Sequence, residues 1–213
     1  MKNYSTTEYG SLFSLGEEAR RLYELKDEIR NEIEKFNFTY LWLPSLTSNN
    51  FFHPQKVESD HLNASLTHAG CLPFFEHVDK FENKVYFGFN RVHRLEPLRN
   101  LNKKSRLESF EVAEIIVTGT EIYTLEMYTK LKDSLTIFLN NKAEGYWNNA
   151  NDSFIRKQKK EEWTVGENTK KIAVASGNYH GDYFSGRRNL KGYSFCFGIG
   201  LERLNEAIKG RAN

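Results

Sequence analysis

The residues best suited to chemistry flank a basic loop between two β-prone segments. Arg94 and Glu96 precede the loop, and Arg106 and Phe110 follow it. The turn formers between them, beginning with Pro97, predict a hairpin that brings the four side chains together. Guanidinium groups bind phosphate oxygens, a carboxylate accepts a hydrogen bond from the adenine amine, and an aromatic ring stacks on a base. The pattern indicates a site for a nucleoside triphosphate, and its alternative is an exposed hairpin that merely carries charge. The loop adds three cations: Arg99, Lys103 and Lys104.

A second phosphate-binding pattern lies near the C-terminus. A β-prone run ends in Gly198 and Gly200, and a helical pattern with Arg203 in its first turn follows. The glycines permit the close approach of a ligand or of another backbone. Arg203 would then present its guanidinium fork beside the N-terminus of the helix. Glycines at such a junction also serve packing alone, so the pattern by itself is not specific.

The chain contains two cysteines, Cys71 and Cys196, which are far apart in the sequence. The N-terminus lacks the apolar run of a signal peptide, and no later segment is long and apolar enough to span a membrane. We therefore expect a cytoplasmic protein, in which a structural disulfide is not expected. The cysteines are either two unrelated buried thiols or members of one site.

Length and composition favour one folded domain over residues 1–213, with residues 1–13 as a loose arm. The chain is 39% hydrophobic and nearly balanced in charge, with 30 Lys+Arg against 28 Asp+Glu. A core of useful size is therefore expected, without a global field for nucleic acid. The residues that must be positioned fall between predicted elements: helices near residues 14–35 and 120–140, strands near 38–43, 84–96, 107–117, 171–177 and 193–200, and a short helix at 205–209. Residues 140–170 are so polar that they are interpreted as a solvated segment.

Together these pieces resemble the catalytic core of class II aminoacyl-tRNA synthetases, through three motifs in the expected order. The long helix with residues 38–44, ending in Pro44, resembles motif 1, whose proline lies at the dimer interface. Arg94-x-Glu96, the loop and Arg106-Leu-x-x-Phe110 resemble motif 2, and residues 198–203 resemble motif 3. The resemblance implies an α+β fold, an antiparallel sheet flanked by helices, and a homodimer formed through the first helix and the Pro44 strand.

The sequence is more similar still to the amino acid:carrier-protein ligases, which are truncated relatives of an atypical, zinc-dependent seryl-tRNA synthetase. The strings behind this similarity are residues 150–154 (ANDSF), 173–184 (AVASGNYHGDYF) and 196–203 (CFGIGLER). In that family a catalytic zinc is held at positions that match Cys71, Glu114 and Cys196. Two thiolates and a carboxylate with one open position describe a catalytic zinc that can take a substrate amine.

The implied reaction is activation of a small amino acid by ATP, which gives an aminoacyl-adenylate and pyrophosphate. The resemblance assigns Arg94 to the α-phosphate and Arg203, aided by Arg106, to the γ-phosphate. It places Phe110 against adenine and Glu96 at its amine. Mg²⁺ is expected on the phosphates, and the sequence offers Glu162 as a candidate ligand.

The implied acceptor is the phosphopantetheine thiol of a carrier protein. The chain departs from its relatives in the short stretches at residues 45–69 and after Phe154, and in Gly177, where the family has a bulkier residue. No segment resembles a tRNA-binding module, so tRNA is not expected as a partner. Two alternatives stay open: the same activation with transfer to a peptide or a small-molecule acceptor, and a non-catalytic regulatory paralogue that binds an amino acid. A regulatory paralogue has no need for the phosphate-binding arginines.

Overall fold

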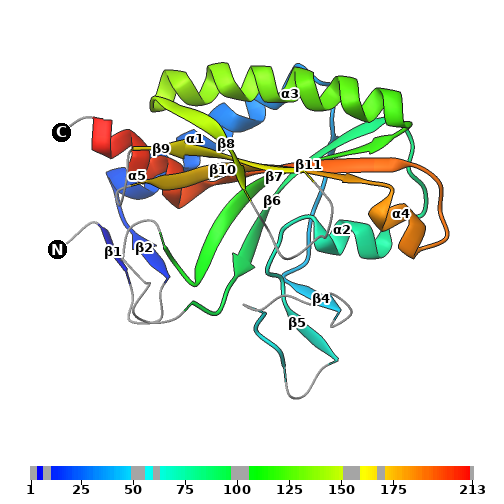
Figure 1. Ribbon diagram of the computed structural model, residues 1–213. Coiled ribbons are helices and arrows are strands. Elements are labelled where there is room, and N and C mark those ends of the chain that lie inside the picture. The colour runs from blue at the N-terminus through cyan, green and yellow to red at the C-terminus, as the bar shows by residue number, and fades with distance from the viewer. Residues whose placement is uncertain are drawn as a thin grey trace.

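The computed structural model describes residues 4–6, 11–48, 56–59, 63–96, 106–150, 159–166 and 171–211. A seven-stranded sheet runs through the middle of the molecule, with helices above and below it in the view of Figure 1. The strand order is β3-β6-β7-β11-β10-β9-β8. All neighbouring pairs are antiparallel except β3 with β6. The strands are β3 (Thr39–Tyr40), β6 (Lys84–His93), β7 (Ser109–Gly119), β11 (Tyr193–Gly200), β10 (Ile172–Gly181), β9 (Lys159–Val165) and β8 (Gly145–Ala150).

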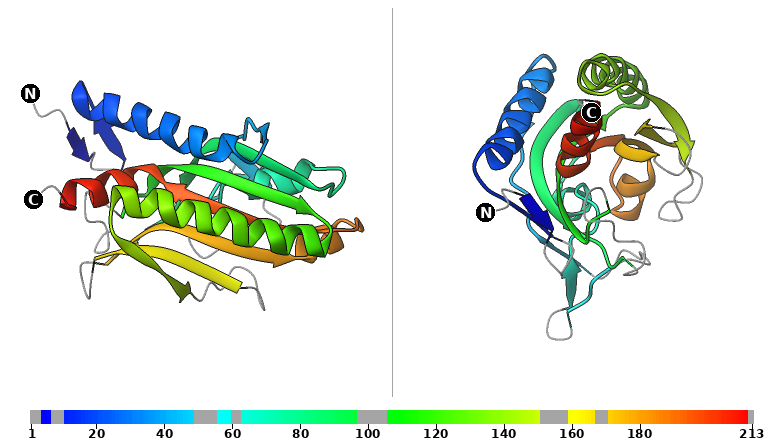
Figure 2. Two further views of the ribbon diagram at one scale, coloured as in Figure 1. Left: turned by 90° about the horizontal axis from the view of Figure 1, so that it is seen from above. Right: turned by 90° about the vertical axis from the view of Figure 1, so that its left-hand side faces the viewer.

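Three helices cover one face of this sheet: α1 (Glu17–Glu34), α3 (Glu121–Lys142) and α5 (Leu201–Arg211). They lie side by side over the strands in Figure 2. The helices predicted near residues 14–35 and 120–140 are confirmed as α1 and α3, and Leu25, Ile29 and Ile33 are the buried residues of α1. Gly16 is the N-cap of α1, and no side chain caps that helix. Thr120 caps α3 and accepts a hydrogen bond from the backbone N–H of Tyr123.

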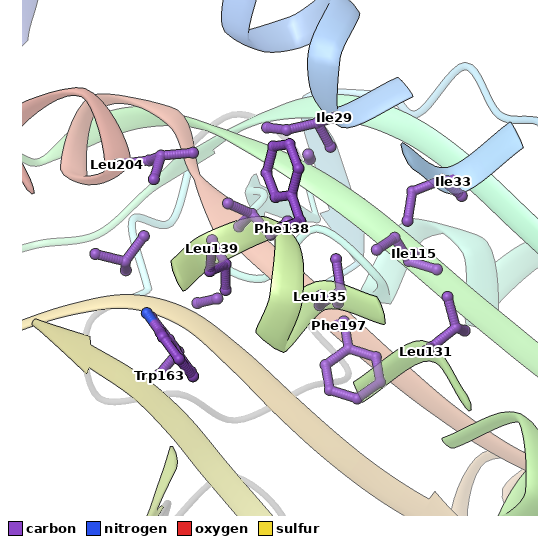
Figure 3. Packing of buried hydrophobic residues seen from close by; sticks show 14 of the residues in the cluster. Ile29, Ile33, Ile115, Leu131, Leu135, Phe138, Leu139, Trp163, Phe197 and Leu204 are labelled. Carbon is purple, nitrogen blue, oxygen red and sulfur yellow. The ribbon is translucent and has the colours of Figure 1, made fainter. Parts of the chain in front are cut away.

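The side chains of β11 alternate between the face of the sheet that the helices cover and the face that lines a cleft. Phe195, Phe197 and Ile199 point toward the helices and are fully buried in the main core. Figure 3 shows Phe197 and Trp163 from the sheet packed with Ile29, Leu135 and other apolar side chains of the helices. The intervening residues of β11, which include Cys196 and both glycines, face the other side because successive strand residues point to opposite faces.

That second side carries the smaller elements α2 (Leu72–His77), α4 (Tyr183–Arg187) and the ribbon of β4 (Leu46–Ser48) and β5 (Ala64–Leu66). A separate apolar cluster forms here, in which the rings of Phe75 and Phe184 stack with centroids 3.9 Å apart. Glu76 of α2 accepts hydrogen bonds from Thr47 Oγ1 at 2.7 Å and from the backbone N–H of Ser48 at 2.9 Å. These bonds fix the ribbon to α2 and so to the segment that carries Cys71.

The polar stretch at residues 140–170 differs from its prediction as a solvated segment. It contributes two sheet strands, β8 and β9, and Trp163 of β9 is 1% exposed. Glu161 points to the helix face, where it accepts hydrogen bonds from Tyr128 Oη at 2.9 Å and Lys132 Nζ at 2.8 Å. Charged residues therefore occupy both faces of β9, which conceals the alternation expected of a strand.

Two strands that pair antiparallel, β1 (Tyr4–Thr6) and β2 (Leu12–Ser14), lie within or next to the expected arm. The last helix begins at Leu201, earlier than the predicted helix at 205–209, and β10 continues to Gly181, beyond the predicted end of its strand at residue 177. None of the helices in the described ranges is long and apolar enough to cross a membrane.

Candidate functional site

Three buried side chains gather on the open face of the sheet near α2. Cys71 is the N-cap of α2, His180 is on β10 and Cys196 is on β11. One atom from each, a sulfur or a ring nitrogen, lies within 4.8 Å of the others. Nε2 of His180 is 3.6 Å from Sγ of Cys196. The predicted association of the two cysteines therefore holds, and the structure adds a histidine to it.

Glu114 adjoins this group from β7, where it is the register partner of Gly198. Its carboxyl group is near enough to the thiols of both Cys71 and Cys196 to affect their pKa values. Burial raises the pKa of Glu114 to about 8, although both thiols and Arg94 oppose this shift. The hydrogen bond with Cys71 and burial raise the pKa of Cys196. In the metal-free protein these acidic groups therefore hold their protons at neutral pH.

The separation between two of the donors fits zinc. With Zn–S about 2.3 Å and Zn–N about 2.0 Å, a tetrahedral ion separates sulfur from nitrogen by roughly 3.5 Å. The separation of 3.6 Å between His180 and Cys196 agrees with that value. Nδ1 of His180 lies 3.3 Å from Oγ of Ser194, which leaves Nε2 directed at the thiols. Histidine ligands usually have such a partner on the second ring nitrogen, which fixes the tautomer.

His180 was not predicted as a ligand because the strand that carries it was expected to end at Gly177. In the structure β10 runs through a register shift between Tyr179 and Gly181, opposite β11. Burial lowers the pKa of His180 to about 3, so the ring is neutral, as a metal ligand must be. The sequence Asn178-Tyr-His180 could have revealed this ligand. If the strand continues past residue 177, Asn178 and His180 lie on the same face of the sheet, because alternate strand residues do.

The predicted phosphate-binding arginines converge at the other end of the same face. The guanidinium carbons of Arg94 and Arg203 lie 5.4 Å and 5.7 Å from the centroid of the Phe110 ring. Nε of Arg94 donates to the carbonyl of His68 at 3.1 Å, and Nη1 of Arg203 donates to the carbonyl of Ala173 at 3.0 Å. Burial lowers the pKa of Arg203 to about 10, and the nearby charges of Arg94 and Arg106 add to this shift. A cluster of cations around one buried ring suits an anionic ligand with an aromatic base.

Glu96 and Arg106 form an ion pair with 3.2 Å between carboxylate oxygen and guanidinium nitrogen. Neither lines the cleft that Arg94, Phe110 and Arg203 line. Glu96 is 7% exposed and one of its carboxylate oxygens accepts from Arg106, so its assignment to the adenine amine stays a prediction. The loop cations Arg99, Lys103 and Lys104 lie outside the described residues.

One cleft joins the two ends. Its empty volume is about 820 Å³, with solvent at the mouth included. The cysteine pair, His180 and Glu114 line one end, and Arg94 and Arg203 line the other. Lys160 and Glu162 of β9 form part of a side wall. Glu162 pairs with Lys160 at 3.3 Å and has Arg203 within electrostatic reach, so cations already neutralise the candidate magnesium ligand. A single paired carboxylate does not fit a magnesium site, and no magnesium ligand is assigned here.

Comparison with known proteins supports the fold. The chain superposes on a cytoplasmic serine-tRNA ligase from Naegleria fowleri, determined with AMP, with a TM-score of 0.78 and 15% identity over 93% of this chain. A prolyl-tRNA synthetase from Giardia lamblia, determined with prolyl-adenylate, gives 0.79 and 13% over 97%. A threonyl-tRNA synthetase structure from Cryptosporidium parvum, described as its RNA binding domain, gives 0.77 and 14% over 96%. The chain therefore has the class II aminoacyl-tRNA synthetase catalytic fold, as its motifs indicated.

The chain spans half the length of the seryl and prolyl enzymes and 68% of the threonyl structure. No protein-family model matches the sequence. A search of curated proteins also found no match. At these low identities the similarity concerns the fold, and the chemistry must be argued from the cleft itself.

Proposed function

We propose that this protein activates a small amino acid with ATP, giving an aminoacyl-adenylate and pyrophosphate. The observation that carries the proposal is the single cleft with a Cys71–His180–Cys196 donor set at one end and two arginines at the other. A substrate that spans these ends has its amine at the metal donors and its carboxylate toward the arginines. One of the superposed synthetases was determined with an aminoacyl-adenylate, the product of such activation, and another with AMP, which an adenylate releases when its acyl group is transferred.

In the proposed reaction the substrate carboxylate attacks the α-phosphorus of ATP, and pyrophosphate leaves. Arg94 neutralises charge on the α-phosphate, and Arg203 holds the outer phosphates, as the sequence resemblance implies. Both guanidiniums are fixed by backbone carbonyls before substrate arrives, so little reorganisation is needed during reaction. Phe110 offers its ring to adenine. Mg²⁺ is expected to enter with ATP.

Zinc, when bound, supplies a positive, tetrahedral centre with a coordination position for a neutral amine. Cys71, His180 and Cys196 would hold it and leave the fourth position to the substrate amine. The two cysteines are ligands expected from the resemblance, and His180 is a donor that the resemblance did not supply. Glu114, the third expected ligand, is not a member of this donor group, and its role at the metal stays a prediction. Two free thiols beside each other are typical of proteins in a reducing compartment, which supports the cytoplasm as the location.

We further propose that the acyl group passes to the phosphopantetheine thiol of a carrier protein. The support is the resemblance of residues 150–154, 173–184 and 196–203 to the carrier-protein ligases. Membrane and tRNA partners are not expected. A homodimer through α1 and the segment around Pro44 is supported by large exposed side chains there, with Tyr23 69%, Tyr40 67% and Trp42 99% exposed.

The experiment that tests activation is product analysis with ATP and each standard amino acid. The proposal predicts AMP and pyrophosphate, after hydrolysis or trapping of the adenylate with hydroxylamine. ADP and phosphate as the products would contradict it. Transfer is tested by offering a radiolabelled amino acid to a holo carrier protein and to its apo form. Label on the holo form alone is expected. If an enzyme that activates the amino acid labels neither form, carrier-protein transfer is contradicted and a peptide or small-molecule acceptor remains.

A further inference from the structure

The sheet register places a polar wall beside the metal donors. Cys196 on β11 pairs with Asn178 on β10, which pairs with Lys160 on β9. Directly opposed residues in antiparallel strands lie on the same face of a sheet. The next row on that face runs from β7 to β9 through Glu114, Gly198, Ser176 and Glu162. The face that carries the metal donors therefore continues across two more strands.

The dimensions of a sheet show how far this wall extends. Adjacent strands are separated by about 4.8 Å, so the backbone of Lys160 is roughly 10 Å from that of Cys196. Lys160 and Glu162 line the same cleft as the metal donors. Gly198 lies between the two carboxylates of its row and contributes no side chain to the floor. This floor leaves room for a substrate side chain beside the donors.

The wall consists of hydrogen-bonding groups rather than aliphatic ones. Nδ2 of Asn178 lies 3.4 Å from Oγ of Ser176 and 3.7 Å from Sγ of Cys196. Nζ of Lys160 lies 3.3 Å from the carboxylate of Glu162, with the two side chains 18% and 32% exposed. These separations are at the long end of hydrogen-bond distances, so the same groups can also bond to a ligand that lies against the wall. Lys160 and Glu162 also cancel in charge, so the wall is neutral as a whole.

The opposite side of the cleft is closed. Gly70 packs against Glu114 so tightly that a Cβ on Gly70 would lie 2.6 Å from Oε2 of that carboxyl. An amino acid with its amine at the metal donors and its carboxylate toward Arg94 must direct its side chain elsewhere. The direction that remains is toward Ser176, Asn178 and the Lys160–Glu162 pair.

We propose that the amino acid activated here has a short, uncharged, polar side chain, a hydroxyl or a carboxamide, which this wall recognises. The inference rests on the proposed function. Such a group both donates and accepts, so it satisfies Glu162 and Lys160 together without breaking their charge balance. An aliphatic side chain would remove these groups from water and leave them without compensation. A charged side chain would have to displace one member of the ion pair.

The first test compares kcat/KM for ATP–pyrophosphate exchange across serine, threonine, asparagine, alanine, valine and aspartate. A site that hydrogen-bonds its substrate rejects analogues without the polar group by factors of up to about 10⁴. We expect serine, threonine or asparagine to exceed alanine and valine by at least about 100-fold. Equal exchange with alanine or valine, or a preference for aspartate, would overturn the inference and leave amino-acid activation in place. No exchange with any amino acid would overturn the proposed function, and the inference with it.

The second test uses two adjacent lysines of β9 that face opposite sides of the sheet. Lys160→Met should raise the KM of the polar substrate at least about tenfold and reduce its advantage over alanine, while zinc content stays the same. Lys159→Met is the matched control, because Lys159 pairs with Glu161 at 3.5 Å, on the helix face. An unchanged preference in Lys160→Met would contradict the proposal. Should that variant fail to fold, Glu162→Gln gives the same comparison and the same criterion.

Discussion

Nε2 of His180 lies 3.6 Å from Sγ of Cys196, although the two residues are on neighbouring strands and sixteen positions apart in the chain. The irregular register at the end of β10 brings the imidazole beside the thiol. Ser194, two residues before Cys196, is within 3.3 Å of the other ring nitrogen. The register shift thus brings together a metal donor, His180, and the residue that orients its ring, Ser194, from adjacent strands.

Removal of one thiol should remove the metal. We expect Cys71→Ser to lower zinc from about one ion per chain to a small fraction, because a hydroxyl is a poor ligand for zinc. Metal analysis of purified protein, with titration of the remaining thiol, is the measurement. Cys196→Ser should behave in the same way. Full zinc occupancy in either variant would show that the cysteines do not form the site.

Ser194 should tune zinc affinity without touching the ion. Ser194→Ala removes the partner of Nδ1 in His180, and loss of such outer contacts weakens metal binding by about 10- to 100-fold. Competition with a chromogenic chelator measures the change in Kd, and circular dichroism checks that the fold persists. An unchanged Kd in a folded variant would mean that the imidazole does not bind the metal.

Arg94 should affect the rate of amino-acid activation but not the binding of zinc. Arg94→Ala is expected to reduce kcat/KM for activation by about 100- to 1000-fold, the usual effect of losing one positioned charge partner in the transition state. Zinc content should equal that of the wild type. Arg91→Ala is a suitable control, since Arg91 lies on β6, three positions before Arg94, and pairs with Glu111 at 3.4 Å, away from the cleft. Equal activity of the two variants would remove Arg94 from the reaction.

The metal-free protein should lose stability as pH rises from 6.5 to 8. Glu114 has a pKa of about 8 when folded and about 4.5 when unfolded, so the folded state holds an extra proton between these values. Stability from this raised pKa is fully present below pH 4.5 and lost as pH rises through 8. His180, with a pKa lowered to about 3, acts in the opposite direction, but only below pH 6.5. The free energy of unfolding should therefore fall by up to about 2 kcal/mol across this window, at 1.36 kcal/mol per unit.

Urea titrations of chelated protein at several pH values measure this slope. Glu114→Gln, which cannot ionise, should flatten it. Stability that rises from pH 6.5 to 8 in the chelated wild type would contradict the assignment.

Much of the site could be predicted from residue types, because Cys71 and Cys196 are the only cysteines and the arginine motifs have definite spacing. His180 could not, since a glycine at position 177 suggested the end of a strand. That glycine instead allows packing: a Cβ there would lie 2.4 Å from the ring of Phe197. The fold class could be predicted from three motifs, but β9 was missed because a buried charge on it, Glu161, is stabilised by a tertiary ion pair with Lys132 that no local pattern reveals.

Trp42 tests the proposed dimer. It is 99% exposed, next to the half-buried segment that leads to Pro44, and exposed aromatic side chains of this size commonly anchor interfaces. Trp42→Arg should shift the protein from dimer to monomer in analytical ultracentrifugation, at matched concentration. Ile122→Arg, on α3, is a control, since Ile122 is 72% exposed on a helix outside the proposed interface. A monomeric wild type would refute the dimer.

The most direct test of the account is amino-acid-dependent ATP–pyrophosphate exchange in one preparation, measured as purified, after chelation, and after return of zinc. The account predicts exchange with a small amino acid, loss of it on chelation to below about 1%, and recovery with about one zinc per chain. Exchange that persists in fully chelated protein would separate the metal donors from activation. No exchange with any amino acid, in folded protein with zinc bound, would contradict the proposed activity itself.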